Sequence, residues 1–269
     1  MFPLCQSWYM ISFIIPVYNK GEILFKTLSS LIAHLNRSPF ADYEIIIVSD
    51  GSTDNSFTEA LRFKTRSNKQ HYIKIFHYNK NIGKGFALRF GFFKSRGQNV
   101  VFLDGDLDIS SNQVLTALKV FYKNQSDMVI GSKYHPRSRI HYPYNRFLYS
   151  LVLKQIIKLM FNLSVSDTQV GLKVFRRDIL SNIFSGLIIK RFAMDLEMLV
   201  VAQMRGYTNI MEVPVIIKRT SAYRSSINIT AVKNFCVDIL AIYYRKNILS
   251  YYDRSLTFKP LPSLQIQTG

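Results

Sequence analysis

Short apolar runs that alternate with helical patterns constrain the fold of this chain more than any other feature. Four such runs are rich in β-branched and aromatic side chains, which is typical of buried strands. They span residues 9–17, 43–48, 72–77 and 100–103. Apolar residues at helical spacing occupy 22–35 and 83–93. This alternation predicts an α/β fold in which a mostly parallel sheet carries helices on both faces.

Polar residues follow the carboxyl ends of several of these expected strands. They are Asn19, Asp50 and Asp104. Open α/β sheets bind their ligands outside the carboxyl ends of the strands, so we expect these residues to mark one binding site. Further along the chain the pattern predicts a strand, an edge strand and three helices. The strands are expected at 172–175 and 210–217, and the helices at 146–163, 193–204 and 229–244.

The chain carries a large excess of basic residues. Its 269 residues include 35 Lys and Arg against 17 Asp and Glu, a formal net charge of +18. Within 119–191 there are thirteen Lys and Arg against three Asp. An aromatic content of 14% excludes a disordered basic tail. The charge therefore predicts an anionic partner, which leaves nucleic acid, an anionic membrane surface and phosphorylated substrates.

Nucleic-acid binding is a remote alternative. The chain has no RRM, KH, zinc-finger or helix-turn-helix pattern, and its basic residues are spread among apolar helices. The two cysteines, Cys5 and Cys236, are too few for a disulfide framework or a zinc site and indicate a reducing compartment. The apolar stretch 147–165 is broken by Lys154 and Lys158, so we expect no unaided membrane span.

The basic, amphipathic region 133–165 is predicted to lie on an anionic membrane surface. Its apolar side chains would enter the headgroup layer, namely Tyr142, Tyr144, Phe147, Tyr149 and Leu153. Its basic side chains would meet anionic lipid, namely Arg137, Arg139, Lys154 and Lys158. The alternative is an ordinary helix face that covers the core and is otherwise solvated.

Three carboxylates follow the expected strand at 100–103. Alternation along an extended chain places Asp104, Asp106 and Asp108 on one side. Carboxylates crowded in this way repel one another unless a cation lies among them, which predicts Mg²⁺ or Mn²⁺ holding a diphosphate. The alternative is an Asp-Gly turn of a hairpin, for which the acids would be incidental.

Two glycine-containing loops are candidate nucleotide contacts. Asp50 begins the loop 50–54 at a strand end, where an acid can bind a base or a ribose. The alternative is a helix N-cap by Ser52 or Thr53. The loop 81–85 precedes an expected helix, so its backbone N–H groups and Lys84 would face a phosphate. A solvated lysine in an ordinary loop is the alternative.

Taken together, the motifs are more specific than any of them alone. In order they are FIIPVYNK (13–20), IIIVSDGSTD (45–54), NIGKGFALRFG (81–91), FLDGDLD (102–108), GSKY (131–134), SDTQVGLKVFRRD (166–178), RFAMDLE (191–197) and EVPVIIK (212–218). With this order and spacing the chain resembles the family 2 glycosyltransferases of the GT-A fold, a Rossmann-like architecture. Within that family it is most similar to the dolichyl- and polyprenyl-phosphate glucosyl- and mannosyltransferases. The resemblance covers roughly residues 10 to 230.

The resemblance implies a donor site for a nucleotide sugar. Its residues would be Pro16, Tyr18, Val48, Asp50, Lys84, Asp104, Gly105, Arg224 and Ser225. Asp106 would bind the Mg²⁺ or Mn²⁺ that bridges the diphosphate, with Asp108 as second ligand. The chain departs from the family where Lys20 and Ser49 replace acids near the nucleobase.

The resemblance also implies an acceptor-phosphate site formed by Lys133, Arg146 and Ser150, although Lys133 replaces the arginine common in the family. Asp167 would lie near the sugar, and Asp195 is the possible base. With Asp106 and Arg146, these two acids make up the expected catalytic set. A lipid-phosphate acceptor needs no strong base, whereas a sugar hydroxyl requires Asp195 or Asp167.

The expected activity is inverting transfer of a hexose from a nucleotide sugar to a polyprenyl or dolichyl phosphate. UDP-glucose is the preferred donor and GDP-mannose the second. The alternative is transfer to a sugar hydroxyl of a glycan with Asp195 as base. We expect a catalytic domain at 1–230, followed at 231–269 by an amphipathic helix and a loose tail. The enzyme would be peripheral on the cytoplasmic face of a membrane, with an integral-membrane protein as a possible partner.

Overall fold

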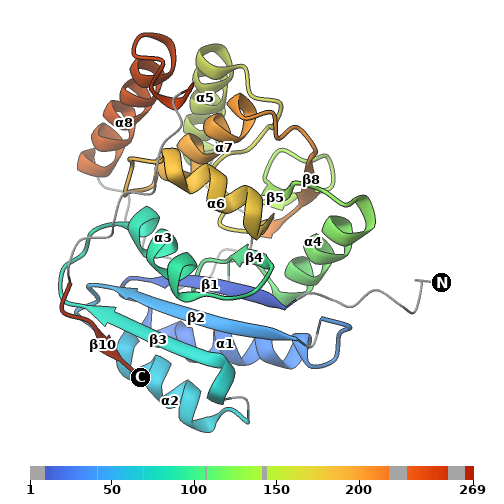
Figure 1. Ribbon diagram of the computed structural model, residues 1–269, viewed down its shortest axis with the longest axis vertical. Coiled ribbons are helices and arrows are strands. Elements are labelled where there is room, and N and C mark those ends of the chain that lie inside the picture. Colours follow the sequence, from blue (N-terminus) through green and yellow to red (C-terminus); the bar gives the residue numbers. More distant parts are fainter. Residues whose placement is uncertain are drawn as a thin grey trace.

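The computed structural model describes most of the chain. The described residues are 10–40, 42–68, 70–106, 108–140, 144–217, 229–253 and 264–269, with backbone alone at 144–149, 229 and 231. Their main feature is an eight-stranded sheet of order β10-β3-β2-β1-β4-β7-β5-β8 (Figure 1). A two-stranded sheet pairs β6 (Arg139–Ile140) with β9 (Ile216–Ile217).

The N-terminal half of the sheet is parallel. Its strands are β1 (Ile11–Val17), β2 (Tyr43–Asp50), β3 (Ile73–Tyr78) and β4 (Asn99–Phe102). The helices that connect them are α1 (Gly21–Leu35), α2 (Ser56–Arg66) and α3 (Lys84–Lys94), with a short 3₁₀ turn at Gln70–Tyr72. The predicted strands and helices of this half are confirmed. Parallel pairing brings the carboxyl ends of β1, β2 and β4 to one edge.

The C-terminal half of the sheet contains a reversed strand. β7 (Lys173–Arg176) is antiparallel to both of its neighbours, β4 and β5 (Met128–Ser132), while β8 (Ile210–Pro214) is parallel to β5 at the sheet edge. The predicted mostly parallel sheet is confirmed, with β7 and β10 as its antiparallel members. Because β7 is reversed, its first residue, Lys173, lies beside Phe102, the last residue of β4.

Five helices accompany this half of the sheet. They are α4 (Ser111–Asn124), α5 (Tyr144–Phe161), α6 (Arg177–Gly186), α7 (Met194–Met204) and α8 (Ile229–Asn247). No helix or strand was predicted at the positions of α4, β5 and α6. A Ser110-x-x-Gln113 capping box marks the start of α4 and is a sequence signal for it. Within the described part of the chain, no helix has the length and hydropathy needed to cross a membrane.

Strand alternation divides the core between the two faces of the sheet. Phe13 and Ile15 of β1 face the cluster that includes α1, α2 and α4. Ile14 faces the opposite cluster, which includes α3, α5, α6, α7 and α8. Figure 1 shows α1 and α2 below the sheet and α3 above it. Helices on both faces thus hold the sheet edge that carries the polar residues.

The C-terminal segment packs onto the hydrophobic cluster that contains α3 and α7. Ile239 and Ile242 of α8 are buried in the same cluster as α3 and α7. Tyr252, in the 3₁₀ turn Tyr251–Asp253, donates a hydrogen bond from its hydroxyl to Glu197 at 2.7 Å. The expected loose tail is wrong for its last residues, because β10 (Gln267–Thr268) pairs with β3.

Gly91 sets how closely α3 packs on the sheet. A Cβ at this position would lie 2.5 Å from Cγ2 of Ile14 and 3.3 Å from Cγ2 of Val48. We expect Gly91→Ala to reduce the free energy of unfolding by about 1–3 kcal/mol, the usual cost of overpacking. Urea denaturation of purified protein measures this change.

Gly186→Ala at the end of α6 is the matched control. Its Cβ would contact mainly the flexible guanidinium of Arg205, at 3.1 Å. We expect this variant to unfold at the same urea concentration as the parent, or slightly higher. Equal destabilisation of the two variants would contradict the close packing of α3 on β1 and β2.

Candidate active site

An alternating chain of charges lies at the carboxyl end of β4. The Lys84 Nζ, in the first residue of α3, is 2.8 Å from Oδ1 of Asp104 and 3.5 Å from Oδ2 of Asp195. The Lys173 Nζ, in the first residue of β7, is 2.7 Å from Oδ1 of Asp195 and donates to the Val170 carbonyl at 2.6 Å. Segments far apart in sequence are therefore joined by one continuous set of ion pairs.

Burial makes each charge in this chain dependent on the next. The side chains of Lys173 and Asp195 are 1% and 5% exposed. Burial lowers the pKa of Lys173, and the charge of Asp195 offsets part of that effect. Burial would raise the pKa of Asp195, but Lys173 and Lys84 outweigh it and lower the pKa. The two ammonium groups thus favour the ionised form of Asp195. A general base works best with a pKa near the operating pH, so this environment does not favour that role.

Asp106 lies beside this chain and next to a lysine. Its Oδ2 is 3.7 Å from Nζ of Lys20, which follows β1, and its Oδ1 accepts a hydrogen bond from the Asp108 backbone N–H at 3.3 Å. Burial raises the pKa of Asp106, and the charge of Asp104 raises it further. A cation near Asp106 would relieve the repulsion between these two carboxylates.

The donor set at Asp106 suits a hard divalent cation. The described residues contain no group of three or more His, Cys, Asp or Glu that could hold a metal by itself. Mg²⁺ and related ions are often bound by one or two carboxylates together with substrate phosphates. Asp106, with Asp108 next to it in the turn, fits that mode. The remaining ligands would then come from a bound diphosphate and from water.

Asp50, at the end of β2, is surrounded by hydrogen-bond donors of the protein itself. Its carboxylate accepts hydrogen bonds from the Tyr78 hydroxyl at 2.8 Å and from the backbone N–H groups of Ile82 and Gly83, both at 2.9 Å. Burial raises its pKa, although these hydrogen bonds act in the opposite direction. Asp50 thus fixes the loop before α3 and, through it, the position of Lys84.

The other predicted donor residues differ in accessibility. Tyr18 is 44% exposed at the end of β1, and Pro16 is half-buried. Val48, predicted to line the nucleobase, has its side chain fully buried in the core beside α3. Gly105 is buried against α1. The predicted residues Arg224 and Ser225 lie outside the described part of the chain.

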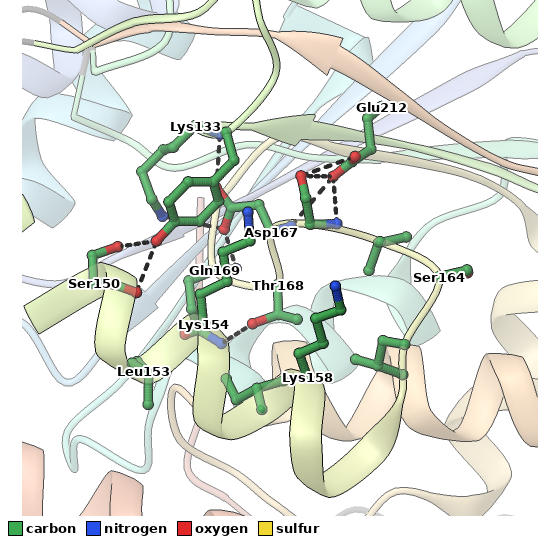
Figure 2. A pocket seen from close by; sticks show the side chains of 15 residues that line it. Lys133, Ser150, Leu153, Lys154, Lys158, Ser164, Asp167, Thr168, Gln169 and Glu212 are labelled. Atoms are coloured by element: carbon green, nitrogen blue, oxygen red, sulfur yellow. Dashed lines mark hydrogen bonds and ion pairs between the residues drawn. The ribbon is translucent and has the colours of Figure 1, made fainter.

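A pocket of about 220 Å³ lies between α5 and the loop 163–169 (Figure 2). Figure 2 shows that its polar lining comes from four separate segments. The charged and hydroxyl side chains in the lining include Lys133, Ser150, Lys154, Lys158, Asp167 and Glu212. Lys133 and Ser150, predicted to bind the acceptor phosphate, are therefore brought together here with Asp167, which was predicted to lie near the sugar.

The two carboxylates of the pocket lining, Asp167 and Glu212, accept hydrogen bonds from neighbouring residues of the protein. Asp167, with a side chain 2% exposed, accepts hydrogen bonds from the Lys133 backbone N–H at 2.7 Å and from its Nζ at 3.2 Å. Glu212 of β8 accepts hydrogen bonds from the backbone N–H and the hydroxyl of Ser166. These contacts fix the loop 163–169 against the ends of β5 and β8.

Tyr134 connects the opposite wall of the pocket to α5. Its hydroxyl donates to the Ser150 carbonyl at 2.8 Å and contacts the Ser150 Oγ. The Lys154 Nζ lies 4.0 Å from the centre of its ring. Arg146, predicted to bind the acceptor phosphate, lies one helical turn before Ser150 on α5, and its side chain is outside the described residues.

One loop joins the pocket to the ion-pair chain. Asp167 at its start lines the pocket, and Lys173 just after its end pairs with Asp195. Between them, Gly171 packs so closely on Asp104 that a Cβ would lie 2.0 Å from Oδ2. The predicted donor and acceptor regions are thus adjacent parts of one site.

Several residues of the site were not identified from the sequence. Lys173 is not among the predicted residues. A lysine within an otherwise apolar strand indicates a buried charge, but the sequence does not show that its partner is Asp195. Tyr134 and Glu212 carried no separate signal. Leu153, Lys154 and Lys158 were expected to face lipid, but they line the pocket. Of the other residues expected at the membrane, Tyr142 and the side chains of Tyr144, Phe147 and Tyr149 lie outside the described residues.

Comparison with known families agrees with this geometry. The model of the family described as "Glycosyl transferase family 2" matches residues 12–184, well over half of the chain. The chain belongs to this family. It is a glycosyltransferase, and the GT-A fold expected from its motifs is confirmed.

Similar proteins include curated enzymes and solved structures. A dolichyl-phosphate beta-glucosyltransferase of Trichomonas vaginalis is 30% identical over 91% of this chain and 76% of its own length. The human dolichyl-phosphate beta-glucosyltransferase is 31% identical over 72% of this chain and 63% of its own length. Glucosyl-3-phosphoglycerate synthase of Mycobacterium tuberculosis, solved with Mn²⁺ and UDP-glucose, superposes with a TM-score of 0.65 at 16% identity, covering 91% of this chain and 80% of that one.

The buried pair Lys173–Asp195 gives a stability prediction. We expect Lys173→Met and Asp195→Asn each to lower the free energy of unfolding by about 3–5 kcal/mol, because each leaves a buried charge with one partner fewer. The double variant should lose less than the sum of the two. Urea denaturation of the four proteins measures the coupling.

The exposed pair Arg62–Glu59, at 3.2 Å on α2, is the control cycle. Its coupling should not exceed about 1 kcal/mol, as for surface ion pairs in general. Strict additivity of the Lys173 and Asp195 variants would contradict the ion-pair chain.

Proposed function

We propose that this glycosyltransferase transfers a hexose from a nucleotide sugar to the phosphate of a polyprenyl or dolichyl phosphate, with inversion at the anomeric carbon. UDP-glucose is the preferred donor and GDP-mannose the second. The observation that carries the proposal is the basic pocket beside α5, which the loop 166–173 joins directly to Asp104 and the ion-pair chain. The names of the curated relatives support the same donor and acceptor class.

On the donor side, the residues act on charge that develops in the leaving diphosphate. Lys84 and Lys20 supply ammonium groups beside Asp104 and Asp106. Asp106, with Asp108, would hold Mg²⁺ or Mn²⁺, which would neutralise the diphosphate when bound. Asp195 holds Lys84 and Lys173 in place. Preorganised charges of this kind stabilise the transition state without reorganisation during the reaction.

On the acceptor side, the pocket orients a nucleophile that is already anionic. A phosphate monoester carries about −1.5 to −2 charges at pH 7, so no strong base has to remove a proton. Orientation is what remains for the protein to supply. The pocket residue Ser150, with Arg146 on the preceding turn of α5 and an ammonium group of the pocket lining, is proposed to supply it. Transfer to a sugar hydroxyl would need a base, and the lowered pKa of Asp195 disfavours that alternative.

We propose that an anionic bilayer covers the exposed apolar face of α5 and α8. The two helices are neighbours in Figure 1, and the rings of Phe161 and Tyr243 lie 6.2 Å apart. Large apolar side chains are exposed on both helices, namely Val152, Ile156, Leu159, Val232, Val237, Leu240 and Tyr244.

Charge favours a lipid surface over a solvated face. Asp238 is the sole acid of the two helices, and it is turned toward Arg191, 3.4 Å away. Lys158 and Lys233 are exposed beside the apolar side chains. An apolar face flanked by lysines is the usual pattern of helices at anionic interfaces. The proposed position is peripheral, on the cytoplasmic face, in keeping with a chain that has two cysteines.

Turnover tests the proposed reaction. Purified protein with Mn²⁺ or Mg²⁺, UDP-glucose and farnesyl phosphate should release UDP and form farnesyl phosphoglucose, measured by chromatography. We expect Asp106→Asn to reduce kcat by about 10²- to 10³-fold, because the leaving group loses its main electrostatic support. Asp178→Asn, at a side chain 73% exposed on α6, should retain full activity. Equal turnover by all three proteins would refute the assigned role of Asp106.

Vesicle flotation tests the proposed membrane face. The parent protein should float with vesicles that contain phosphatidylserine and stay unbound with neutral vesicles. Leu240→Glu places a charge at a side chain 63% exposed on α8 and should abolish flotation. Tyr72→Glu introduces the same negative charge at an exposed aromatic residue in the 3₁₀ turn before β3. This control variant should float like the parent. Flotation of Leu240→Glu at the parent level would show that the face does not touch lipid.

A further inference from the structure

We propose that Lys154, and not Lys133, is the ammonium group that contacts the acceptor phosphate in the pocket. This inference rests on the proposed function, because it concerns the same acceptor. The ammonium group that binds the phosphate would then come from α5 and not from Lys133 at the end of β5. The residues concerned are those labelled in Figure 2.

Lys133 is held by the carboxylate of Asp167, which forms no ion pair with another cation among the residues that the structure describes. Its Nζ is 3.2 Å from Oδ1 of Asp167, and its backbone N–H donates to Oδ2 of the same residue. The side chain of Asp167 is 2% exposed. Turning Lys133 toward a ligand would leave a buried carboxylate uncompensated, which is costly. Lys133 and Asp167 therefore act as a neutral pair that fixes the loop.

Lys154 lies in the same pocket with its charge uncompensated. Among the residues that the structure describes, no carboxylate is within ion-pair distance of Lys154 or Lys158. Lys154 instead lies over the ring of Tyr134, with Nζ 4.0 Å from the ring centre. An aromatic face orients an ammonium group and leaves its net charge intact. Tyr134 is in turn fixed by Ser150, so the ammonium has a defined position.

The spacing along α5 places this lysine beside the predicted acceptor residues. Arg146, Ser150, Lys154 and Lys158 follow one another at intervals of four residues, which puts their backbone positions on one face of the helix. The last three line the pocket. Lys158 is exposed and precedes Leu159, which is 86% exposed. It thus lies at the mouth of the pocket, next to the proposed membrane face.

The charges on this face match a phosphate monoester. Lys133 and Asp167 cancel. Lys154 and Lys158 against Glu212 leave one positive charge among the described residues of the pocket lining. A phosphate monoester carries about −1.5 to −2 charges at pH 7. The acceptor phosphate would therefore neutralise the uncompensated charge, with Lys154 as its central contact.

Binding and kinetics with farnesyl phosphate test the assignment on the full chain. We expect Lys154→Ala to raise both the Kd by calorimetry and the KM for farnesyl phosphate by about tenfold or more, as for the loss of one charge-assisted hydrogen bond. The KM for the nucleotide sugar should stay within about twofold of the parent. Lys154→Arg should restore most of the affinity. Lys119→Ala, at an exposed lysine of α4, should match the parent.

Lys133→Ala separates the two lysines. We expect it to lower the melting temperature, because Asp167 loses its partner, with a smaller effect on the Kd for farnesyl phosphate than Lys154→Ala has. The reverse order of the two Kd values would overturn the assignment. The assignment would also be overturned if Lys154→Ala weakened the binding of farnesol, which lacks the phosphate, as much as the binding of farnesyl phosphate. The effect of Lys154→Ala would then come from packing.

Inorganic phosphate separates the two sources of this ligand. We expect Lys154→Ala to weaken the binding of inorganic phosphate as well. The parent should bind farnesyl phosphate more tightly than inorganic phosphate, because the prenyl chain adds apolar contacts. Tighter binding of inorganic phosphate would overturn the lipid acceptor. If the parent binds farnesyl phosphate but releases no nucleoside diphosphate, the proposed reaction fails, and the Kd values alone still decide the role of Lys154.

Discussion

The buried ion pair between Lys173 and Asp195 is the constraint on which the rest of the site depends. A charge with 1% to 5% of its side chain exposed is tolerated only beside an opposite charge, so α7 and β7 are fixed relative to each other. Lys84 extends the pair to Asp104 and fixes the start of α3 as well. The edge of the sheet is therefore organised by electrostatics before any ligand binds.

The reversed strand β7 explains how this edge reaches the pocket. Because β7 runs antiparallel to β4, the loop that enters it crosses the carboxyl end of β4. Gly171 lets that loop lie directly on Asp104, and Asp167 at its start is tied to Lys133. A few residues thus hold the pocket and the ion-pair chain, which are the proposed acceptor and donor regions, at a fixed separation. A rigid connection of this kind serves a reaction whose main requirement is orientation.

The pocket opens beside the exposed apolar face of α5 and α8. Lys158 stands at the pocket mouth, and the exposed Leu159 follows it on the same helix. A lipid phosphate on an anionic bilayer would meet the lysines of α5 as its prenyl chain stays among apolar side chains. Under the proposed function, the large positive charge of the chain, concentrated between 119 and 191, would serve both lipid attraction and phosphate binding.

The sequence alone determined the α/β fold, the family and the acids at the strand ends, because hydrophobic periodicity and short motifs are local properties of the chain. The family resemblance also implied that Lys133 and Ser150 belong to one acceptor site, and the structure adds Asp167 to the same pocket lining. Tertiary structure decided what each charge does. Lys173, Lys154 and the core position of Val48 could not be assigned from their neighbours in sequence, because burial and ion pairing depend on segments far away along the chain. The partner of a charge, more than its residue type, sets its role.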